Sequence, residues 1–182
     1  MNEKYKNRLS KQVFHRNMQA LRLPKLVEAD PRGQELFSRL TAHARPLWSE
    51  GKIRVPTVAF NPALAEALRV AHRAGQLVRS LENAERKLAA EGRGLDLVDK
   101  KSGVSRGERV SRLLVLADNG AERFYRQVEK LLRQHGPRVM AVRLDVEAET
   151  LGQTLFGSSS RVLLLLLDHK EAVSAVLLAL AV

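Results

Sequence analysis

The stretch LLVLADNG, residues 113–120, decides the fold class. Its first five residues form an unbroken apolar run, and Asp118, Asn119 and Gly120 follow as turn-forming residues. A strand that is apolar throughout, without polar alternation, is typical of a sheet covered by helices on both faces. We therefore predict a fully buried strand over residues 113–117 that ends in a turn.

Two further segments, the mainly apolar Val139 to Leu144 and the apolar run Val162 to Leu167, indicate two more buried strands. Segments with apolar residues at helical spacing lie between and after them, with Gly136 and Gly157 at helix ends. Strands that alternate with helices fold as layers. The sequence thus predicts an α/β protein, a three-layer αβα sandwich with a mostly parallel central sheet, preceded by an N-terminal helical extension.

Upstream of these strands, Asn61 can cap a helix with Pro62 in its first turn, and Gly75 stops that helix. A short strand candidate covers Gln76 to Arg79, and Ser80 can cap the helix that follows.

Two other segments carry local expectations. The polar, glycine-containing stretch Glu91 to Glu108 predicts an exposed loop. Asp168, directly after the third buried strand, is expected to cap the C-terminal helix.

The chain divides into a basic helical extension, residues 1–58, and a sandwich domain, residues 59–182. Residues 7–23 carry apolar side chains at helical spacing, which predicts a first helix. A second helix is expected to start at Asp30, with an apolar stripe as far as Trp48, and Pro46 should kink or end it.

Composition points to a polyanionic partner. Lysine and arginine total 31 against 20 aspartate and glutamate, a net charge of +11, and residues 1–60 alone hold 12 basic and 5 acidic side chains. Such a positive field favours nucleic acid or an acidic surface. The chain has no cysteine, which excludes disulfides, thiol nucleophiles and thiolate metal sites. No secretory signal and no apolar run of about 20 residues is visible, so we predict a cytoplasmic protein without membrane contact.

Residues for catalysis or metal binding are not grouped in the sequence. The five histidines, at 15, 43, 72, 135 and 169, lack the spacing of a zinc site, and Ser158 to Ser160 lack the glycines of a nucleophile elbow. Asp118 after a buried strand fits either a catalytic acid or, more simply, a tight turn. We predict a protein that is not an enzyme and holds no metal and no cofactor.

The best candidate site surrounds the helix that begins near Ser80. A helix start offers backbone N–H groups and the positive end of a dipole, and basic side chains flank it. Short polar side chains beside it could read exposed bases of structured RNA, whereas the alternative is a solvated amphipathic helix. The predicted RNA-binding residues are Arg73, Gln76, Arg79, Ser80, Glu82, Asn83, Arg86 and Lys87, with Lys100, Lys101 and Arg106 further along and Arg8, Lys11 and Arg16 in the extension.

Three places from residue 61 onward resemble the kink-turn RNA-binding ribosomal protein family and its small bacterial relatives. They are Leu68 to Val78 with its AHRAG turn, the apolar strand Leu113 to Gly120, and the leucine–glycine pair at the start of the helix in Glu149 to Gly152. The resemblance implies a compact αβα sandwich that binds bent RNA. It implies contacts at the helix start after the first short strand, and at the loop Asp145 to Glu149.

The sequence departs from the family pattern at three points. Ser80 stands where the family has a glycine. The family usually places an asparagine or a lysine beside a glutamate at this helix start, whereas here Glu82 comes first and Asn83 follows. The second loop carries the carboxylates of Asp145, Glu147 and Glu149, which oppose phosphate.

These observations predict a non-catalytic RNA-binding protein, acting on ribosomal RNA or a ribosome-associated particle, with ribosomal or assembly proteins as further partners. The alternative is a protein–protein interaction module that docks through its N-terminal helices. A third hypothesis is an enzyme with Asp118 and Asp145 as acids at strand ends.

Overall fold

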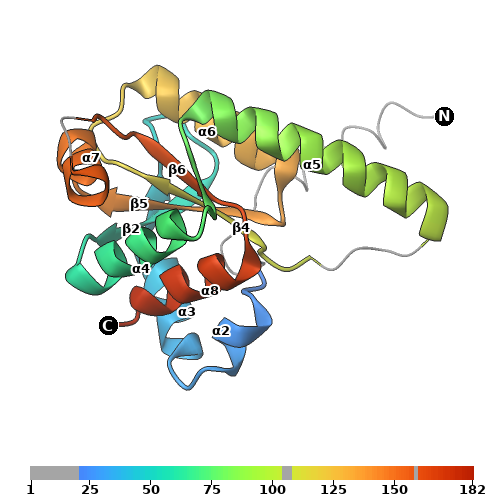
Figure 1. Cartoon of the computed structure of the whole chain (residues 1–182), viewed down its shortest axis with the longest axis horizontal. Helices are drawn as coiled ribbons and strands as arrows, with labels where there is room; N and C mark the ends of the chain where they lie inside the picture. The colour runs from blue at the N-terminus through green and yellow to red at the C-terminus, as the bar shows by residue number, and fades with distance from the viewer. Residues whose placement is uncertain (1–20, 104–107, 158–159) are drawn as a thin grey trace.

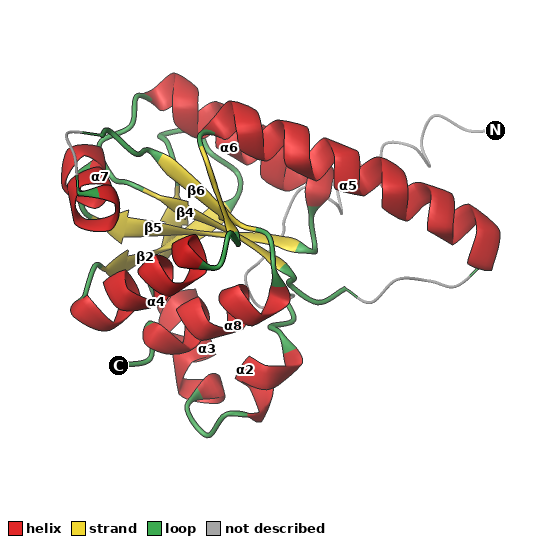
Figure 2. Cartoon of the chain, in the orientation of Figure 1, coloured by secondary structure: helices red, strands yellow, loops and turns green. Residues whose placement is uncertain are grey.

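The computed structural model describes residues 21–103, 108–157 and 160–182. In these ranges a twisted sheet forms a middle layer between two layers of helices (Figures 1 and 2). This confirms the predicted α/β class and the αβα layering. Arg8, Lys11, Arg16 and Arg106 lie outside the described residues, as do residues 7–20 of the helix expected over 7–23. The last three residues of that prediction, 21–23, are not helical, and Arg22 forms a β-bridge with Arg109.

The described sheet has six strands in the order β1-β2-β5-β4-β6-β3. The central strands β2, β5 and β4 are parallel neighbours, whereas β1 pairs antiparallel with β2, and β6 pairs antiparallel with both β4 and β3. Four of these strands thus run in one direction, and antiparallel pairing is confined to the two flanks. The strands are β1 (Ala44–Pro46), β2 (Arg54–Ala59), β3 (Leu77–Arg79), β4 (Arg112–Leu116), β5 (Val139–Asp145) and β6 (Leu164–Leu167).

Helices cover both faces of the sheet. The long helices α5 (Leu81–Ser102) and α6 (Glu122–His135) cover one face. The other face packs against a larger group of helices (Figure 1). They are α2 (Lys25–Ala29), α3 (Gly33–Ala42), α4 (Pro62–Arg73), α7 (Ala148–Phe156) and α8 (Lys170–Ala179).

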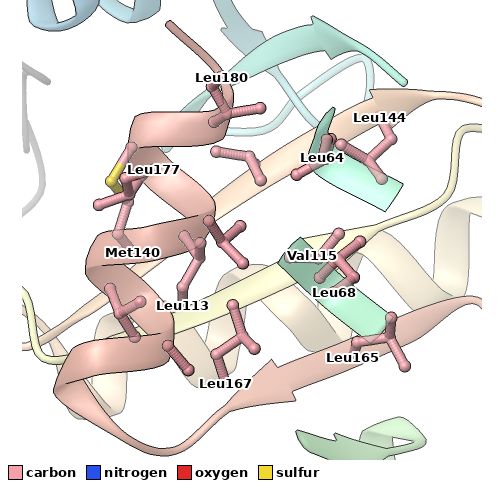
Figure 3. Close-up of a cluster of buried hydrophobic side chains, with 14 of the residues drawn as sticks. Leu64, Leu68, Leu113, Val115, Met140, Leu144, Leu165, Leu167, Leu177 and Leu180 are labelled. Atoms are coloured by element: carbon pink, nitrogen blue, oxygen red, sulfur yellow. The ribbon is translucent and has the colours of Figure 1, made fainter. Parts of the chain in front are cut away.

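Alternate residues of the buried strands supply the two halves of the core. Leu113 and Val115 face α4 and α8, where they meet Leu68 and Leu177, as Figure 3 shows. Leu114, between them in sequence, faces α5 and α6. Burying a leucine side chain stabilises the fold by about 1.5–3 kcal/mol. The unbroken apolar run therefore reflects burial on both faces, as predicted.

The expected helix start at residue 61 is confirmed. The Asn61 side chain accepts a hydrogen bond from the Leu64 amide at 2.8 Å, and Pro62 is the first helical residue. Gly75 follows α4 with φ +67°, a conformation that favours glycine.

The expected second helix forms, but it covers only Gly33–Ala42. Asp30 ends α2 and accepts a hydrogen bond from the Arg32 amide at 2.9 Å, and α3 begins only at Gly33. The chain then turns into β1, an edge strand, where the missing N–H of Pro46 disturbs no central ladder. The indole N–H of Trp48 donates to Glu129 on α6 at 3.0 Å, so the apolar stripe continues as packing on another helix.

The described part of the N-terminal region belongs to the same fold as the rest. Val27, Leu36 and Leu40 are buried in the core cluster that also contains residues of α4 and α8. Strand β2 crosses the expected boundary at residue 58 and pairs with β5. Residues 21–58 therefore complete the sandwich and do not form a separate layer of helices beside it.

The loop expected over Glu91 to Glu108 is also wrong as far as residue 102. Helix α5 continues through it and ends at Gly103, whose φ is +63°. The Glu91 carboxylate anchors α5 to the sheet, since it binds Arg112 of β4 at 3.0 Å and Arg138, the residue before β5, at 2.9 Å. These ion pairs offset the cost of two helical glycines, about 1 kcal/mol each. Beyond this anchor α5 projects away from the sheet (Figure 1).

Asp168 does not cap the last helix by its side chain, because the N-cap of α8 is His169 and the Asp168 carboxylate is engaged elsewhere. It lies 3.3 Å from the Lys87 ammonium and 2.8 Å from the His169 ring. It therefore joins α5 to the start of α8.

No helix within the described residues combines the length and apolarity needed to cross a bilayer.

Candidate nucleic-acid interface

The start of α5 lies at one edge of the sheet, where β3 ends. The Ser80 amide donates to the Leu164 carbonyl of β6 at 3.2 Å. The Ser80 hydroxyl accepts from the Asn83 amide at 3.4 Å, and the Asn83 side chain donates back to the Arg79 carbonyl at 3.1 Å. This reciprocal pair caps the helix, as predicted for Ser80, and fixes Asn83 against the strand end.

Ser80 has φ 77° and ψ 150°. This region is essentially restricted to glycine, and a side chain held there costs about 1–3 kcal/mol. Among non-glycine residues of the described chain, it alone has positive φ. The strained residue stands where the resembled family has a glycine, so the backbone keeps a glycine-type turn without the glycine.

Arg79 and Arg86 provide positive charge at this point, and both are exposed. Arg86 pairs with Glu82 one helical turn earlier at 2.9 Å, and both side chains are largely in solvent. Such a pair contributes little to stability and can exchange its partner. Arg79 has no carboxylate partner in the described residues.

Two aromatic residues that the sequence analysis did not single out complete the surface. The guanidinium of Arg79 stacks on the Phe156 ring, and the same ring meets His72 edge-on with centroids 4.8 Å apart. Phe156 ends α7 directly before Gly157, which has φ +66°. The only feature of the sequence that could have pointed to Phe156 was its position at the end of the helix that contains the leucine–glycine pair.

The second loop of the resemblance shares this edge of the sheet. The strands β3, β4 and β5 all end here, and β6 begins here, since Ala117 donates to Leu163 and Asp118 donates to Val146. The loop Asp145 to Glu149 is thus aligned with the start of α5 across β4 and β6.

The acidity of that loop is partly compensated. Glu149 accepts a hydrogen bond from Asn119 at 2.9 Å and pairs with Arg161 at 2.8 Å. The hydrogen bond from Asn119, with smaller contributions from the backbone and Arg161, holds the pKa of Glu149 below its usual value. One of three carboxylates therefore has a cation beside it, while Asp145 and Glu147 are exposed.

Several predicted site residues lie away from the start of α5. Arg73 and Gln76 precede β3, and Arg73 pairs with Glu66 at 2.9 Å. Lys87 is two turns along α5 and holds the buried Asp168. Lys100 and Lys101 are in the last turn, about 30 Å from Ser80 along the helix. The structure thus brings together only Arg79, Ser80, Glu82, Asn83 and Arg86 from the predicted set.

The segment Asp118 to Gly120 forms a braced turn. The Asn119 side chain accepts from the Ala148 amide at 2.8 Å, at the start of α7. The Tyr125 hydroxyl donates to the Ala117 carbonyl at 2.7 Å and accepts from the Gly120 amide at 3.1 Å. These contacts explain why Asn119 and Gly120 follow the buried strand. In residues 21–103, 108–157 and 160–182 there is no cluster of three His, Cys, Asp or Glu side chains suited to a metal ion.

Comparison of the chain with models of protein families and with curated proteins found no match.

Proposed function

We propose that this chain is a non-catalytic RNA-binding protein that contacts structured RNA at the start of α5. The observation that carries the proposal is the glycine-type backbone of Ser80, flanked by Arg79 and Asn83. Strained backbone is retained where a site requires a particular shape. The resemblance from residue 61 onward assigns an RNA contact to the same position.

The electrostatics support a polyanionic ligand. The chain has a net charge of +11, and Arg79 at the edge of the site has no acid to neutralise it in the described residues. Backbone N–H groups at the first turn of α5 add the positive end of a helix dipole. Ribosomal RNA, or a ribosome-associated particle, is the ligand class that this proposal favours, with cytoplasmic location.

The test is a binding titration with the full chain. A kink-turn RNA and a straight duplex of the same composition are compared by filter binding at several salt concentrations. The proposal expects binding at low salt that weakens steeply as salt rises, because counterions are released from the RNA. Absence of binding to either RNA at low salt would contradict it.

Arg86→Gln and Arg32→Gln make a matched pair of variants. Both arginines are exposed and paired with one carboxylate, but Arg32 lies between α2 and α3 on the other helical layer. Arg86→Gln is expected to weaken RNA binding about five-fold and Arg32→Gln to leave it unchanged. Equal effects would indicate that binding is spread over the whole basic surface.

The alternative, a module that docks proteins through its N-terminal helices, makes a different prediction. In that case a protein would copurify with the chain after nuclease treatment, and neither arginine variant would release it. A deletion of residues 1–58 would remove β1 and most of β2 from the sheet, so the copurification test uses the full chain.

A further inference from the structure

Partly buried arginines in this protein are almost all held by acceptors of the chain itself. Arg112 and Arg138 share Glu91, Arg109 binds Glu28 and the Leu23 carbonyl, and Arg69 binds the Thr154 carbonyl. Arg143 differs, since neither a carboxylate nor a carbonyl in the described residues accepts from it. Its Nε atom is buried and has no hydrogen-bond partner.

An unpaired N–H of this kind is costly. The guanidinium remains charged at all ordinary pH values, and a buried donor that lost its water must regain a partner. Native proteins rarely leave such a group unpaired, and a bound water, an ion or a ligand can supply the missing acceptor. Arg143 is therefore a group whose acceptor is to be sought outside the described chain.

The position of Arg143 points to a ligand site. It lies two residues before the end of β5, in register with Thr57 of β2 and Leu116 of β4. Ligands of open α/β sheets bind outside the carboxyl ends of parallel strands, and these three strands are parallel. The start of α5 lies at the same edge of the sheet.

No carboxylate in the described residues forms an ion pair with Arg143, although the charges of Arg143 and Asp118 both act on the Tyr125 hydroxyl. Arg143 has the same strand parity as Val139 and Ala141, so it faces the layer of α5 and α6. Its Cζ lies 6.0 Å from the centroid of the Tyr125 ring, whose hydroxyl is already engaged by Ala117 and Gly120. Asp145, two residues further on the same side of β5, forms no ion pair with it.

We propose that Arg143 binds a phosphate group at the carboxyl ends of β2, β5 and β4, and that this phosphate belongs to the RNA held at the start of α5. A planar guanidinium binds two phosphate oxygens at once, which a lysine cannot do. The identity of the phosphate as part of RNA rests on the proposed function. The phosphate chemistry rests on Arg143 alone.

The experiment uses the variants Arg143→Met and Arg143→Lys in the full chain, each checked by urea unfolding. Methionine keeps an unbranched chain and removes the unpaired donor, so stability is expected to be unchanged or higher. RNA affinity is expected to fall about ten-fold in Arg143→Met, with the slope of log K against log salt reduced by about 1. Arg143→Lys is expected to keep the slope but to bind more weakly than the wild type.

A second arm titrates inorganic phosphate and follows the melting temperature. Stabilisation of the wild type but not of Arg143→Met supports the site even if no RNA binds. RNA binding that responds to the variants, without a response to free phosphate, assigns the site to RNA alone. If Arg143→Met matches the wild type in both arms, a water molecule satisfies the group and the inference is overturned.

Discussion

The guanidinium carbon of Arg79 lies 4.0 Å from the centre of the Phe156 ring, so the end of β3 is joined to the end of α7. The two residues are 77 positions apart in the sequence. Their contact fixes the arginine that stands directly before Ser80. A site assembled from such distant segments depends on the sandwich as a whole.

A double-mutant cycle should detect this contact. Arg79→Gln and Phe156→Leu are each expected to lower the free energy of unfolding, and the double variant to lose less than the sum. The coupling should be about 0.5–1 kcal/mol, the usual strength of an exposed cation–π pair. Urea unfolding of the four proteins measures it. Strict additivity would show that the two side chains are neighbours without energetic coupling.

Replacing Ser80 with glycine should stabilise the protein. Ser80→Gly removes a strain of about 1–3 kcal/mol, whereas losing the capping hydroxyl to glycine costs only a few tenths. We expect a net gain of about 1 kcal/mol in the free energy of unfolding. Ser80→Ala keeps the strain and loses the cap, so it should be about 1 kcal/mol less stable than the wild type. A destabilised Ser80→Gly variant would mean that the turn is unstrained.

The layered fold was predictable because its signals are local and strong. The runs 113–117 and 162–167 are apolar at every position, and the run 139–144 is apolar except at Arg143, a pattern that burial on both faces explains. The caps at Asn61 and Ser80 were also predictable, since each needs only a side chain and an amide three residues away.

The secondary-structure predictions were wrong where contacts with distant residues outweigh the local sequence pattern. Glycines and charges in 91–102 favour a loop, but Glu91 gains two arginine partners from β4 and the residue before β5. The end of the stripe, Leu47 and Trp48, is apolar because it packs in the core on the side of α6, which no helical periodicity reveals. Likewise Phe156 contacts Arg79, which lies far from it in the sequence, so the sequence pattern could not single Phe156 out.

Glu91 and Glu82, on the same helix, should differ in their effect on stability. Glu91→Gln leaves two partly buried guanidinium groups without a carboxylate and should cost about 2 kcal/mol. Glu82→Gln breaks an exposed pair with Arg86 and should change stability by less than about 0.5 kcal/mol. Chemical denaturation measures both. Similar values would show that α5 does not depend on its anchor to the sheet.

The helical glycines Gly152 and Gly94 form a second contrast. A Cβ at Gly152 would lie 1.7 Å from the Ser160 carbonyl oxygen, whereas a Cβ at Gly94 would meet nothing within 4 Å. Gly152→Ala should therefore cost about 2 kcal/mol or more through forced displacement of backbone. Gly94→Ala should stabilise α5 by about 0.5–1 kcal/mol. Thermal unfolding distinguishes them, and a harmless Gly152→Ala would show that the segment before β6 yields easily.

The pairing of Asp168 should make part of the stability depend on acid pH. Burial alone would raise the pKa of Asp168, but hydrogen bonds from His169 and Lys87 outweigh it and hold the pKa below its usual value. A carboxyl with a depressed pKa contributes stability above its unfolded pKa, near 3.9, and loses it as pH falls through the folded pKa. Asp168→Asn should therefore be less stable than the wild type at pH 7. The difference between the two free energies of unfolding should shrink as pH falls below about 4. Urea midpoints at pH 7, 5 and 3 measure the effect, and a gap for Asp168→Asn that stays constant with pH would contradict it.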